Sequence, residues 1–338
     1  MSQPALRTAA VDAPARDGIG APWLKDRPWI DDESQDIEPY IAHLPADRRN
    51  TMRTRLETWR SEGVLVFENV VPRDLLDAFL HDLEELKAEP RRYHVEINHT
   101  GRKFFADDES QDLSRADFND TFFRICQIHW LSKAASRLAL VPEVAEFISI
   151  IFQQPAVVMQ TLTFLKSSQQ PPHIDYPYVR AQRRLAFMLA SWIPLEDVHP
   201  DAGPLAYYPG GHKPEASGFF EWNPGEILQN SGSTKHPNDF AAYLRGRMTA
   251  RGIAAKTFLP RKGDVLLWHG NLPHEGTRIR NTALTRRSLV THYTSLDGVP
   301  VWWESFMGDA ARVAVENAYG RSVEPASAPK VKLPSWHT

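Results

Sequence analysis

A histidine and an aspartate in this sequence lie at a spacing that suits metal binding. His173 and Asp175 are two positions apart in the segment PPHIDYPYV, and side chains at positions i and i+2 of a strand point to the same side. A further histidine could come from residues 268–293, much later in the chain. Two histidines and one carboxylate on one face leave three coordination positions open, which is the arrangement that a non-haem iron oxygenase needs.

The same His-x-Asp spacing occurs a second time, at His199 and Asp201. Pro200 and Gly203 indicate a turn there, whereas His173 follows a strand-like segment and the QQPP turn. The context therefore favours His173 and Asp175 as the metal ligands, although the spacing alone does not decide between the two pairs.

Three histidines in the segment WHGNLPHEGTRIRNTALTRRSLVTHY are candidates for the third ligand. They are His269, His274 and His292. His269 ends an apolar strand, where a structural or ligand-supporting role is the simpler interpretation. His274 lies where the strand gives way to a turn that contains glycine, which is a good position for a side chain that reaches back to a metal.

An arginine and a serine follow on the next predicted strand. Arg286 and Ser288 are two positions apart, so that a guanidinium and a hydroxyl would share one face and could bind the far carboxylate of a dicarboxylate such as 2-oxoglutarate. Arg287 is the alternative, but strand alternation allows only one of the two arginines to face inward. The pairing with Ser288 favours Arg286.

The predicted elements that position these residues are mainly strands. A strand over residues 63–71 precedes a helix over 75–86, and a second helix over 143–152 precedes a strand over 157–166. Short apolar strands then alternate with Pro, Gly and Asp turns as far as Thr294, in LAFMLASWIPL, GPLAYYPG, GDVLLWHG and RRSLVTHYT. The pattern predicts a mainly β fold with flanking helices, whose core is a double-stranded β-helix of the cupin-like jelly-roll kind.

The predicted domain organisation is a single oxygenase domain over residues 26–322. Within it we expect a helical part at 26–156 and the jelly-roll core at 157–295. A polar insertion at 219–251 interrupts the core and contains a possible helix at 239–248. Residues 1–25 and 323–338 lack periodicity and are expected to be a flexible N-terminal segment and a tail.

Composition narrows the class of protein. The 338 residues include 39 basic and 42 acidic residues, a formal charge of -3, which gives no reason to expect nucleic acid or an anionic membrane as partner. Cys126 is the only cysteine, which excludes intramolecular disulfides and thiolate zinc clusters and points to a reducing compartment. Without an apolar signal segment, the protein is expected to be cytoplasmic and to act on a small molecule.

Four motifs, in order, resemble the phytanoyl-CoA dioxygenase family of Fe(II)- and 2-oxoglutarate-dependent oxygenases. They are EGVLVFENVVPRDLLDAFLHDLEEL, PPHIDYPYV, SWIPLEDVHPDAGPLAYYPGGHK and GDVLLWHGNLPHEGT with the following RRSLVTHY. The resemblance covers most of the ordered chain. Two positions depart from the family pattern, Pro172 where an aromatic residue is common and Glu275 where a small residue is usual.

The resemblance implies an Fe(II) site made by His173, Asp175 and His274, with 2-oxoglutarate and O₂ as cosubstrates. It selects His274 over His269, and Arg286 over Arg287 as the 2-oxoglutarate anchor beside Ser288. It also puts Gln160, Lys166 and Trp192 near the cosubstrate pocket, although Gln160 and Lys166 could equally be the polar face of a strand and Trp192 a core residue. The implied reaction is oxidation of a substrate C–H bond, with release of succinate and CO₂.

Asp175 bears on the type of reaction. Relatives that halogenate generally lack this carboxylate, so its presence favours hydroxylation, with desaturation, epimerisation and cyclisation as alternatives that use the same ligands. Two other classes remain open, namely a zinc hydrolase with the same ligands and a cupin-like binding or sensor protein. The substrate and the oligomeric state are unassigned. Candidate substrate contacts, each better explained as solvated surface, are Tyr176, Tyr178, Arg180, Arg102, Lys103 and Asn119.

Overall fold

The computed structural model describes residues 26–298, apart from 112, 114–117, 119, 180–183 and 223–235. The expected N-terminal segment at 1–25 and tail at 323–338 lie outside the described residues, as do Asn119 and Arg180.

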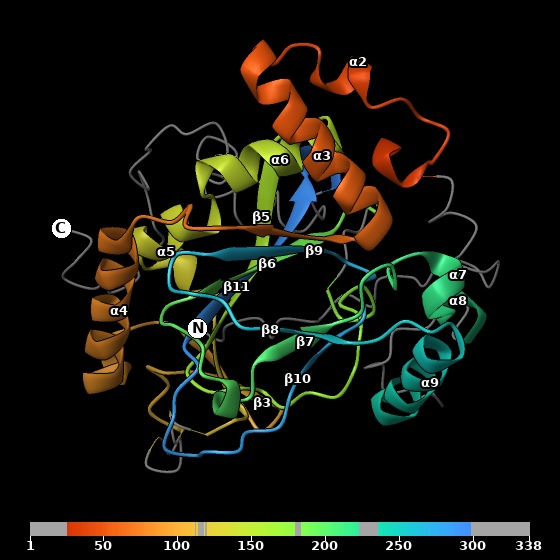
Figure 1. The fold of residues 1–338 in the computed structure, drawn as a ribbon. Helices are drawn as coiled ribbons and strands as arrows, with labels where there is room; N and C mark the ends of the chain where they lie inside the picture. The colour runs from red at the N-terminus through yellow and green to blue at the C-terminus, as the bar shows by residue number, and fades with distance from the viewer. Residues whose placement is uncertain are drawn as a thin grey trace, which may run out of the picture.

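An eight-stranded antiparallel sheet forms the centre of the described chain (Figure 1). Short β-branched and aromatic segments make its strands, as the alternation in the sequence predicts. In spatial order these are β1 (Val64–Phe67), β9 (Val265–His269), β6 (Leu189–Pro194), β11 (Ser288–Ser295), β5 (Ala156–Phe164), β4 (Phe123–Cys126), β2 (Glu96–His99) and β3 (Arg102–Phe105).

A smaller antiparallel sheet lies on one side of the large one (Figure 1). Its strands, in spatial order, are β10 (His274–Gly276), β7 (Leu205–Tyr207) and β8 (Lys256–Phe258). Leu205 and Phe258 pack against Trp192, Leu266 and Val290 of the large sheet in one apolar cluster. The two sheets therefore enclose an interior, which the predicted jelly roll requires.

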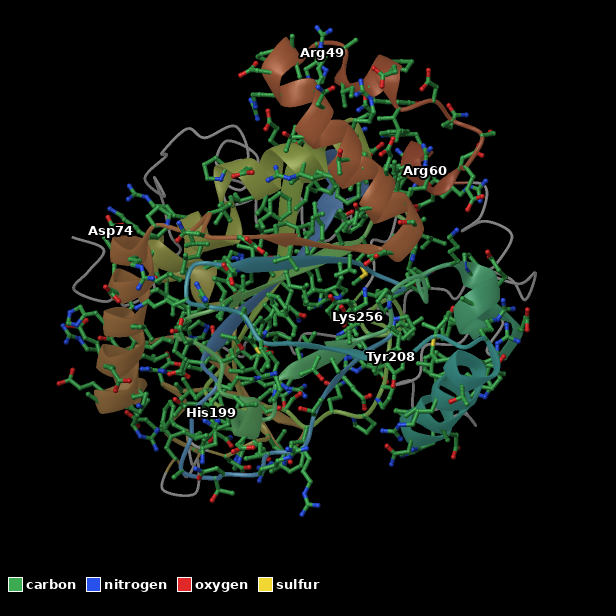
Figure 2. The ribbon with its side chains drawn as sticks, in the orientation of Figure 1. Arg49, Arg60, Asp74, His199, Tyr208 and Lys256 are labelled. Carbon is green, nitrogen blue, oxygen red and sulfur yellow. The ribbon has the colours of Figure 1, made fainter. Side chains whose placement is uncertain are left out.

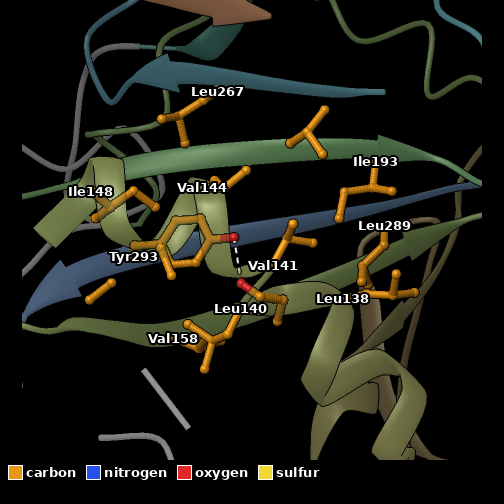
Figure 3. Packing of buried hydrophobic residues seen from close by; sticks show 14 of the residues in the cluster. Leu138, Leu140, Val141, Val144, Ile148, Val158, Ile193, Leu267, Leu289 and Tyr293 are labelled. Carbon is orange, nitrogen blue, oxygen red and sulfur yellow. Dashed lines mark hydrogen bonds between the residues drawn. The ribbon is translucent and has the colours of Figure 1, made fainter. Parts of the chain in front are cut away.

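Helices cover the opposite face of the large sheet. On that face α6 (Pro142–Phe152) contributes Val144 and Ile148 to an apolar cluster. They pack against Leu289, Ile193 and Leu267 of three adjacent strands (Figure 3). Tyr293 is buried in the same cluster, and its hydroxyl donates to the carbonyl of Ala139 at 2.7 Å. Because alternate residues of β11 point to opposite faces, Leu289 packs against helices while Ser288 and Val290 face the interior.

The helices lie mainly before β5 and between β7 and β8. They are α2 (Glu38–Ile41), α3 (Ala46–Glu62), α4 (Arg73–Ala88), α5 (Lys133–Ala139), α6 (Pro142–Phe152), α7 (Pro214–Ser217), α8 (Phe219–Trp222) and α9 (Pro237–Ala250), with short 3₁₀ turns η1 (Trp29–Asp31), η2 (Pro90–Arg92), η4 (Ile128–Trp130), η5 (Pro200–Ala202) and η6 (Leu296–Gly298). None of the helices in this part of the chain has both the length and the apolar character of a membrane span.

One glycine joins the first long helix to the sheet. Gly63 ends α3 with a φ of +68°, which an L side chain rarely adopts. A Cβ at this position would lie 2.3 Å from the ring of His212, so this contact also requires glycine. The turn therefore delivers the chain directly into β1, at the edge of the large sheet.

The mainly β prediction with flanking helices is confirmed. The segments expected around β1, α4, α6, β5, β6, β7, β9 and β11 are all present, and the helix expected at 239–248 lies within α9. Strands β2 to β4 and helices α3 and α5 were not expected. In α3 only Met52, Leu56 and Trp59 are buried, among five arginines, so its apolar stripe is sparse.

The helix-covered face should carry much of the stability. Leu289→Ala removes a fully buried side chain and should lower the free energy of unfolding by about 2–5 kcal/mol. Leu259→Ala, at a side chain that is 52% exposed, should change it by no more than about 0.5 kcal/mol. Urea unfolding of both variants checks this, and equal losses would contradict the packing described.

Candidate metal centre

Two histidines from distant parts of the chain are joined by backbone hydrogen bonds. The amide of His173 donates to the carbonyl of His274 at 3.0 Å, and the amide of His274 donates back at 2.9 Å. This is an isolated antiparallel bridge rather than a regular strand at His173. Pro171 lacks an amide donor and a turn follows Asp175, so the strand expected over 173–175 is limited to one pair.

Gly270 holds the other end of the same segment. The amides of Asp175 and Tyr176 both donate to the Gly270 carbonyl at 3.1 Å, and the Gly270 amide donates to Met188 at 3.0 Å. The carbonyl of Asp175 in turn accepts from the amides of Tyr178 and Val179, which closes a turn. Asp175 therefore has a defined backbone position although it lies outside any strand.

The three predicted ligands come together at this point. One ligand atom from each of His173, Asp175 and His274 lies within 4.8 Å of the others. Oδ1 of Asp175 is 3.8 Å from Nε2 of His173 and 3.6 Å from Nε2 of His274. The side chains are 12%, 10% and 8% exposed in that order.

Backbone carbonyls determine which nitrogen of each ring faces the centre. Nδ1 of His173 lies 2.9 Å from the carbonyl of Pro171, and Nδ1 of His274 lies 3.0 Å from the carbonyl of Leu272. A carbonyl can only accept, so each Nδ1 carries the proton and each Nε2 has a free lone pair. This is the tautomer that a metal ligand needs.

The charge state of the group also suits a cation. Burial, with a smaller contribution from His274, lowers the pKa of His173 to about 3. Burial alone would raise the pKa of Asp175, but attraction to His274, His292 and His173 outweighs it and leaves that pKa below its usual range. The neutral imidazole of His173 and the carboxylate of Asp175 thus face one another near neutral pH.

The other histidines that the sequence offers have different partners. Nε2 of His269 lies 3.3 Å from Oδ2 of Asp31, and its Nδ1 accepts from the amide of Asn271 at 3.0 Å. His292 lies 3.6 Å from Oδ2 of Asp175, on the side away from His173 and His274. His199, whose side chain is 53% exposed, lies at the periphery beside η5 (Figure 2).

On the interior face of the large sheet lies a group of buried polar atoms that have no hydrogen-bond partner within the described part of the chain. These atoms are Nε of Arg286, Oγ of Ser288, Oε1 of Gln160 and Nε1 of Trp192. Arg286 is 4% exposed and its guanidinium lies over the Trp192 ring, 5.3 Å from the centroid. Burial lowers the pKa of Arg286 to about 10, which keeps the guanidinium charged near neutral pH.

Arg287 and Lys166, two further residues considered for the cosubstrate pocket, have partners outside this group of buried atoms. Arg287 pairs with Glu196 at 2.8 Å and is 30% exposed, so it faces away from the interior. Nζ of Lys166 donates to the carbonyl of Thr282 at 2.6 Å, in the loop that leads to Arg286. Alternation along the strand thus separates the two arginines as the sequence pattern predicts.

Arg124 on β4 is a feature that the sequence analysis did not single out. Its guanidinium lies 5.5 Å from the centroid of the Phe164 ring and donates to Oε1 of Gln170 at 3.3 Å. Its Nε is buried without a hydrogen-bond partner, and no ion pair of Arg124 exists among the described residues. Phe164 is opposite Ser288 in the sheet, so Arg124 shares the interior face. The short strand FRIC carried no signal for this.

The candidate substrate contacts are spread over the region. Tyr178 lies beside the metal ligands, with its ring centroid 6.1 Å from that of His173. Tyr176 packs against Phe219 of α8 at 6.2 Å. Arg102 and Lys103 lie on the edge strand β3, where Lys103 pairs with Glu96 at 3.2 Å.

Glu275, the unusual residue next to His274, connects β10 to α9. Its carboxylate accepts from the hydroxyl of Tyr208 at 2.8 Å and lies 3.3 Å from Arg245 of α9. Figure 2 shows Tyr208 on the side of the small sheet that faces α9. The departure from the family pattern therefore ties α9 to β10.

Comparison with known proteins now identifies the family. The model of the phytanoyl-CoA dioxygenase family matches residues 59–288, well over half of the chain. The chain belongs to this family. It is accordingly an enzyme of the 2-oxoglutarate-dependent non-haem iron class, and the Fe(II), 2-oxoglutarate and O₂ predicted from the sequence are the cofactor and cosubstrates of that class. No functionally curated protein matches the sequence.

Several solved structures share the fold. EctD from S. alaskensis with bound Fe is 17% identical, covers 75% of this chain and 78% of its own, and has a TM-score of 0.52. The alpha-ketoglutarate-dependent carbocyclase SnoK from nogalamycin biosynthesis is 18% identical to this chain. The match covers 76% of this chain and 86% of SnoK, with a TM-score of 0.51. The epimerase SnoN from the same biosynthesis is 15% identical to this chain. The match covers 73% of this chain and 84% of SnoN, with a TM-score of 0.50. These identities show the fold alone, and confirm the predicted jelly roll.

The position of Asp175 should depend on the absence of a side chain at residue 270. A Cβ on Gly270 would lie 2.8 Å from the carbonyl oxygen of Met188, so Gly270→Ala should lower the free energy of unfolding by about 1–3 kcal/mol and weaken metal binding. Gly246→Ala in α9, where a Cβ meets nothing within 4 Å, should stabilise by up to about 1 kcal/mol. Thermal unfolding and Zn(II) titration test the pair, and a stabilised Gly270→Ala would contradict the contact.

Proposed function

We propose that this enzyme hydroxylates a C–H bond of a small molecule, with Fe(II) held by His173, Asp175 and His274. The observation that carries the proposal is the convergence of two Nε2 lone pairs and one carboxylate oxygen at a buried point. A set of two nitrogens and one oxygen with open positions is the ligand set typical of non-haem Fe(II) oxygenases.

The unpaired polar atoms of the interior support 2-oxoglutarate as the cosubstrate. Arg286 and Ser288 would hold its far carboxylate, with Trp192 and Gln160 beside them. A buried guanidinium without a carboxylate is costly, and a dicarboxylate that pairs with it would remove that cost. Arg124 adds a second positive charge on the same face, which suits a ligand that carries two negative charges.

The residues of this chain would have three tasks in the reaction. The carbonyls of Pro171 and Leu272 keep the ligand histidines in one tautomer and orientation. The apolar interior around Trp192, Leu266 and Val290 excludes bulk water from the centre. Tyr178, beside His173, lies where a substrate could be positioned.

When bound, Fe(II) would supply O₂ activation coupled to decarboxylation of 2-oxoglutarate to succinate and CO₂. One oxygen atom of O₂ enters succinate and the other enters the substrate as a hydroxyl group, so the atoms balance. The carboxylate of Asp175 occupies the position that halogenating relatives leave open for halide, which supports hydroxylation. The fold also hosts a carbocyclase and an epimerase, so product analysis has to decide between hydroxylation and these outcomes.

Replacing one of the proposed ligands, a histidine or Asp175, should abolish Fe(II) binding. We expect the purified enzyme, reconstituted anaerobically with Fe(II), to form succinate from 2-oxoglutarate on exposure to O₂, and Asp175→Ala and His274→Ala to lose Fe(II) binding. His269→Ala is the matched control and should retain the metal, since His269 faces Asp31.

This experiment also separates the rival functions. A hydrolase would bind Zn(II) but would show no optical change on addition of 2-oxoglutarate, and a binding protein would bind metal without forming succinate. Loss of Fe(II) in His269→Ala, with binding retained in His274→Ala, would contradict the ligand set.

The two adjacent arginines give a matched test of the cosubstrate pocket. Arg286→Gln should raise the dissociation constant of 2-oxoglutarate about 10- to 100-fold, because a hydrogen bond to a charged group contributes about 1.5–3 kcal/mol. Arg287→Gln loses only the partly exposed pair with Glu196 and should bind like the unmodified enzyme. Anaerobic titration of the Fe(II)-loaded enzyme measures both, and equal effects would contradict the proposed anchor.

A further inference from the structure

The second oxygen of Asp175 has its own hydrogen-bond donor. Nε1 of Trp268 donates to Oδ2 at 2.8 Å, whereas Oδ1 is the oxygen that faces Nε2 of His173 and of His274. Both side chains are buried, Trp268 at 2% exposure. The two carboxylate oxygens thus have different surroundings. Oδ1 faces the proposed ligand histidines, and Oδ2 accepts a hydrogen bond from the indole.

The sheet leaves the indole little freedom. Trp268 lies on β9 between Ala190 of β6 and Val64 of β1. Its ring also contacts the ring of His274, with centroids 5.0 Å apart. His292, 3.6 Å from Oδ2, faces the same side of the carboxylate. The N–H group of Trp268 is therefore directed at Oδ2 by packing on both sides of its strand.

We propose that Trp268 is a positioning residue that keeps Asp175 a one-oxygen ligand. The inference rests on the proposed function, since it concerns how Asp175 would bind Fe(II). A carboxylate can bind a metal through one oxygen or through both. To bind through both oxygens the carboxylate would have to rotate so that Oδ2 also faces the metal, and this would bend or break the hydrogen bond from the buried indole.

The number of coordination positions left open on Fe(II) depends on whether Asp175 binds through one oxygen or through two. With one oxygen from Asp175, three positions of an octahedral ion stay open, which is what a chelating 2-oxoglutarate and O₂ together require. With both oxygens bound, one of these positions is occupied by the protein. Trp268 would thus act on cosubstrate binding without touching the cosubstrate.

Trp268→Phe separates the N–H group from the ring. Phenylalanine keeps an aromatic ring against His274 but has no donor for Oδ2. The matched control is Trp59→Phe, because Trp59 is also fully buried and its Nε1 has no hydrogen-bond partner among the residues that the structure describes. The measurements are the affinity for 2-oxoglutarate by anaerobic optical titration of the Fe(II)-loaded enzymes, and Fe(II) X-ray absorption before the cosubstrate is added.

We expect Trp268→Phe to weaken 2-oxoglutarate binding about 10- to 100-fold, the usual effect of removing a partner that orients a metal ligand. X-ray absorption should show one additional carboxylate oxygen on Fe(II), and Trp59→Phe should match the unmodified enzyme in both measurements. A Trp268→Phe enzyme with unchanged affinity and an unchanged iron spectrum would overturn the proposal. Failure of the unmodified enzyme to bind Fe(II) and 2-oxoglutarate would instead overturn the proposed function.

A measurement on the unmodified enzyme covers the case in which Trp268→Phe does not fold. In the Zn(II)-loaded protein the indole N–H of Trp268 should exchange with solvent far more slowly than that of Trp130, whose side chain is 43% exposed. Its NMR resonance should shift when Zn(II) is added, because Oδ2 belongs to the ligating carboxylate. Exchange as fast as at Trp130, or no shift with Zn(II), would overturn the proposal.

Discussion

The arrangement of the metal centre depends on backbone hydrogen bonds between two segments that are far apart in sequence. The paired amides and carbonyls of His173 and His274 fix the separation of these two residues, and the carbonyl of Gly270 fixes the position of Asp175 through its amide. Backbone groups can only pair in a few geometries, so the side chains inherit a defined separation. The large sheet serves this arrangement by holding β9, which carries Trp268 and leads into Gly270, between β1 and β6.

Much of the geometry of the candidate site could be predicted from sequence, for physical reasons. Strand alternation is strictly two-residue, so the inward position of Arg286 and the outward position of Arg287 follow once the strand is recognised. The jelly roll follows from the regular succession of short apolar segments and turns. The choice of His274 over His269 depended on family resemblance, because both histidines lie near the end of an apolar segment and only the partner Asp31, far away in sequence, distinguishes them.

Other features could not be predicted because they depend on contacts between distant residues. Arg124 belongs to a four-residue strand whose periodicity is too short to interpret, and its place beside Phe164 depends on the pairing of β4 with β5. The strand expected at residues 173–175 was wrong in detail, because adjacent prolines and the turn after Asp175 limit it to a single bridge. The contacts of Glu275 depend equally on α9, whose Arg245 pairs with it from another part of the chain.

The buried charge of Arg286 affects the stability of the folded protein. The free protein carries a desolvated cation that no carboxylate of the described chain neutralises, and this makes the empty fold less stable than it could be. A ligand that binds only the folded state shifts the folding equilibrium toward it by mass action. If 2-oxoglutarate pairs with Arg286 as proposed, its binding would therefore stabilise the folded enzyme as well as serve the reaction.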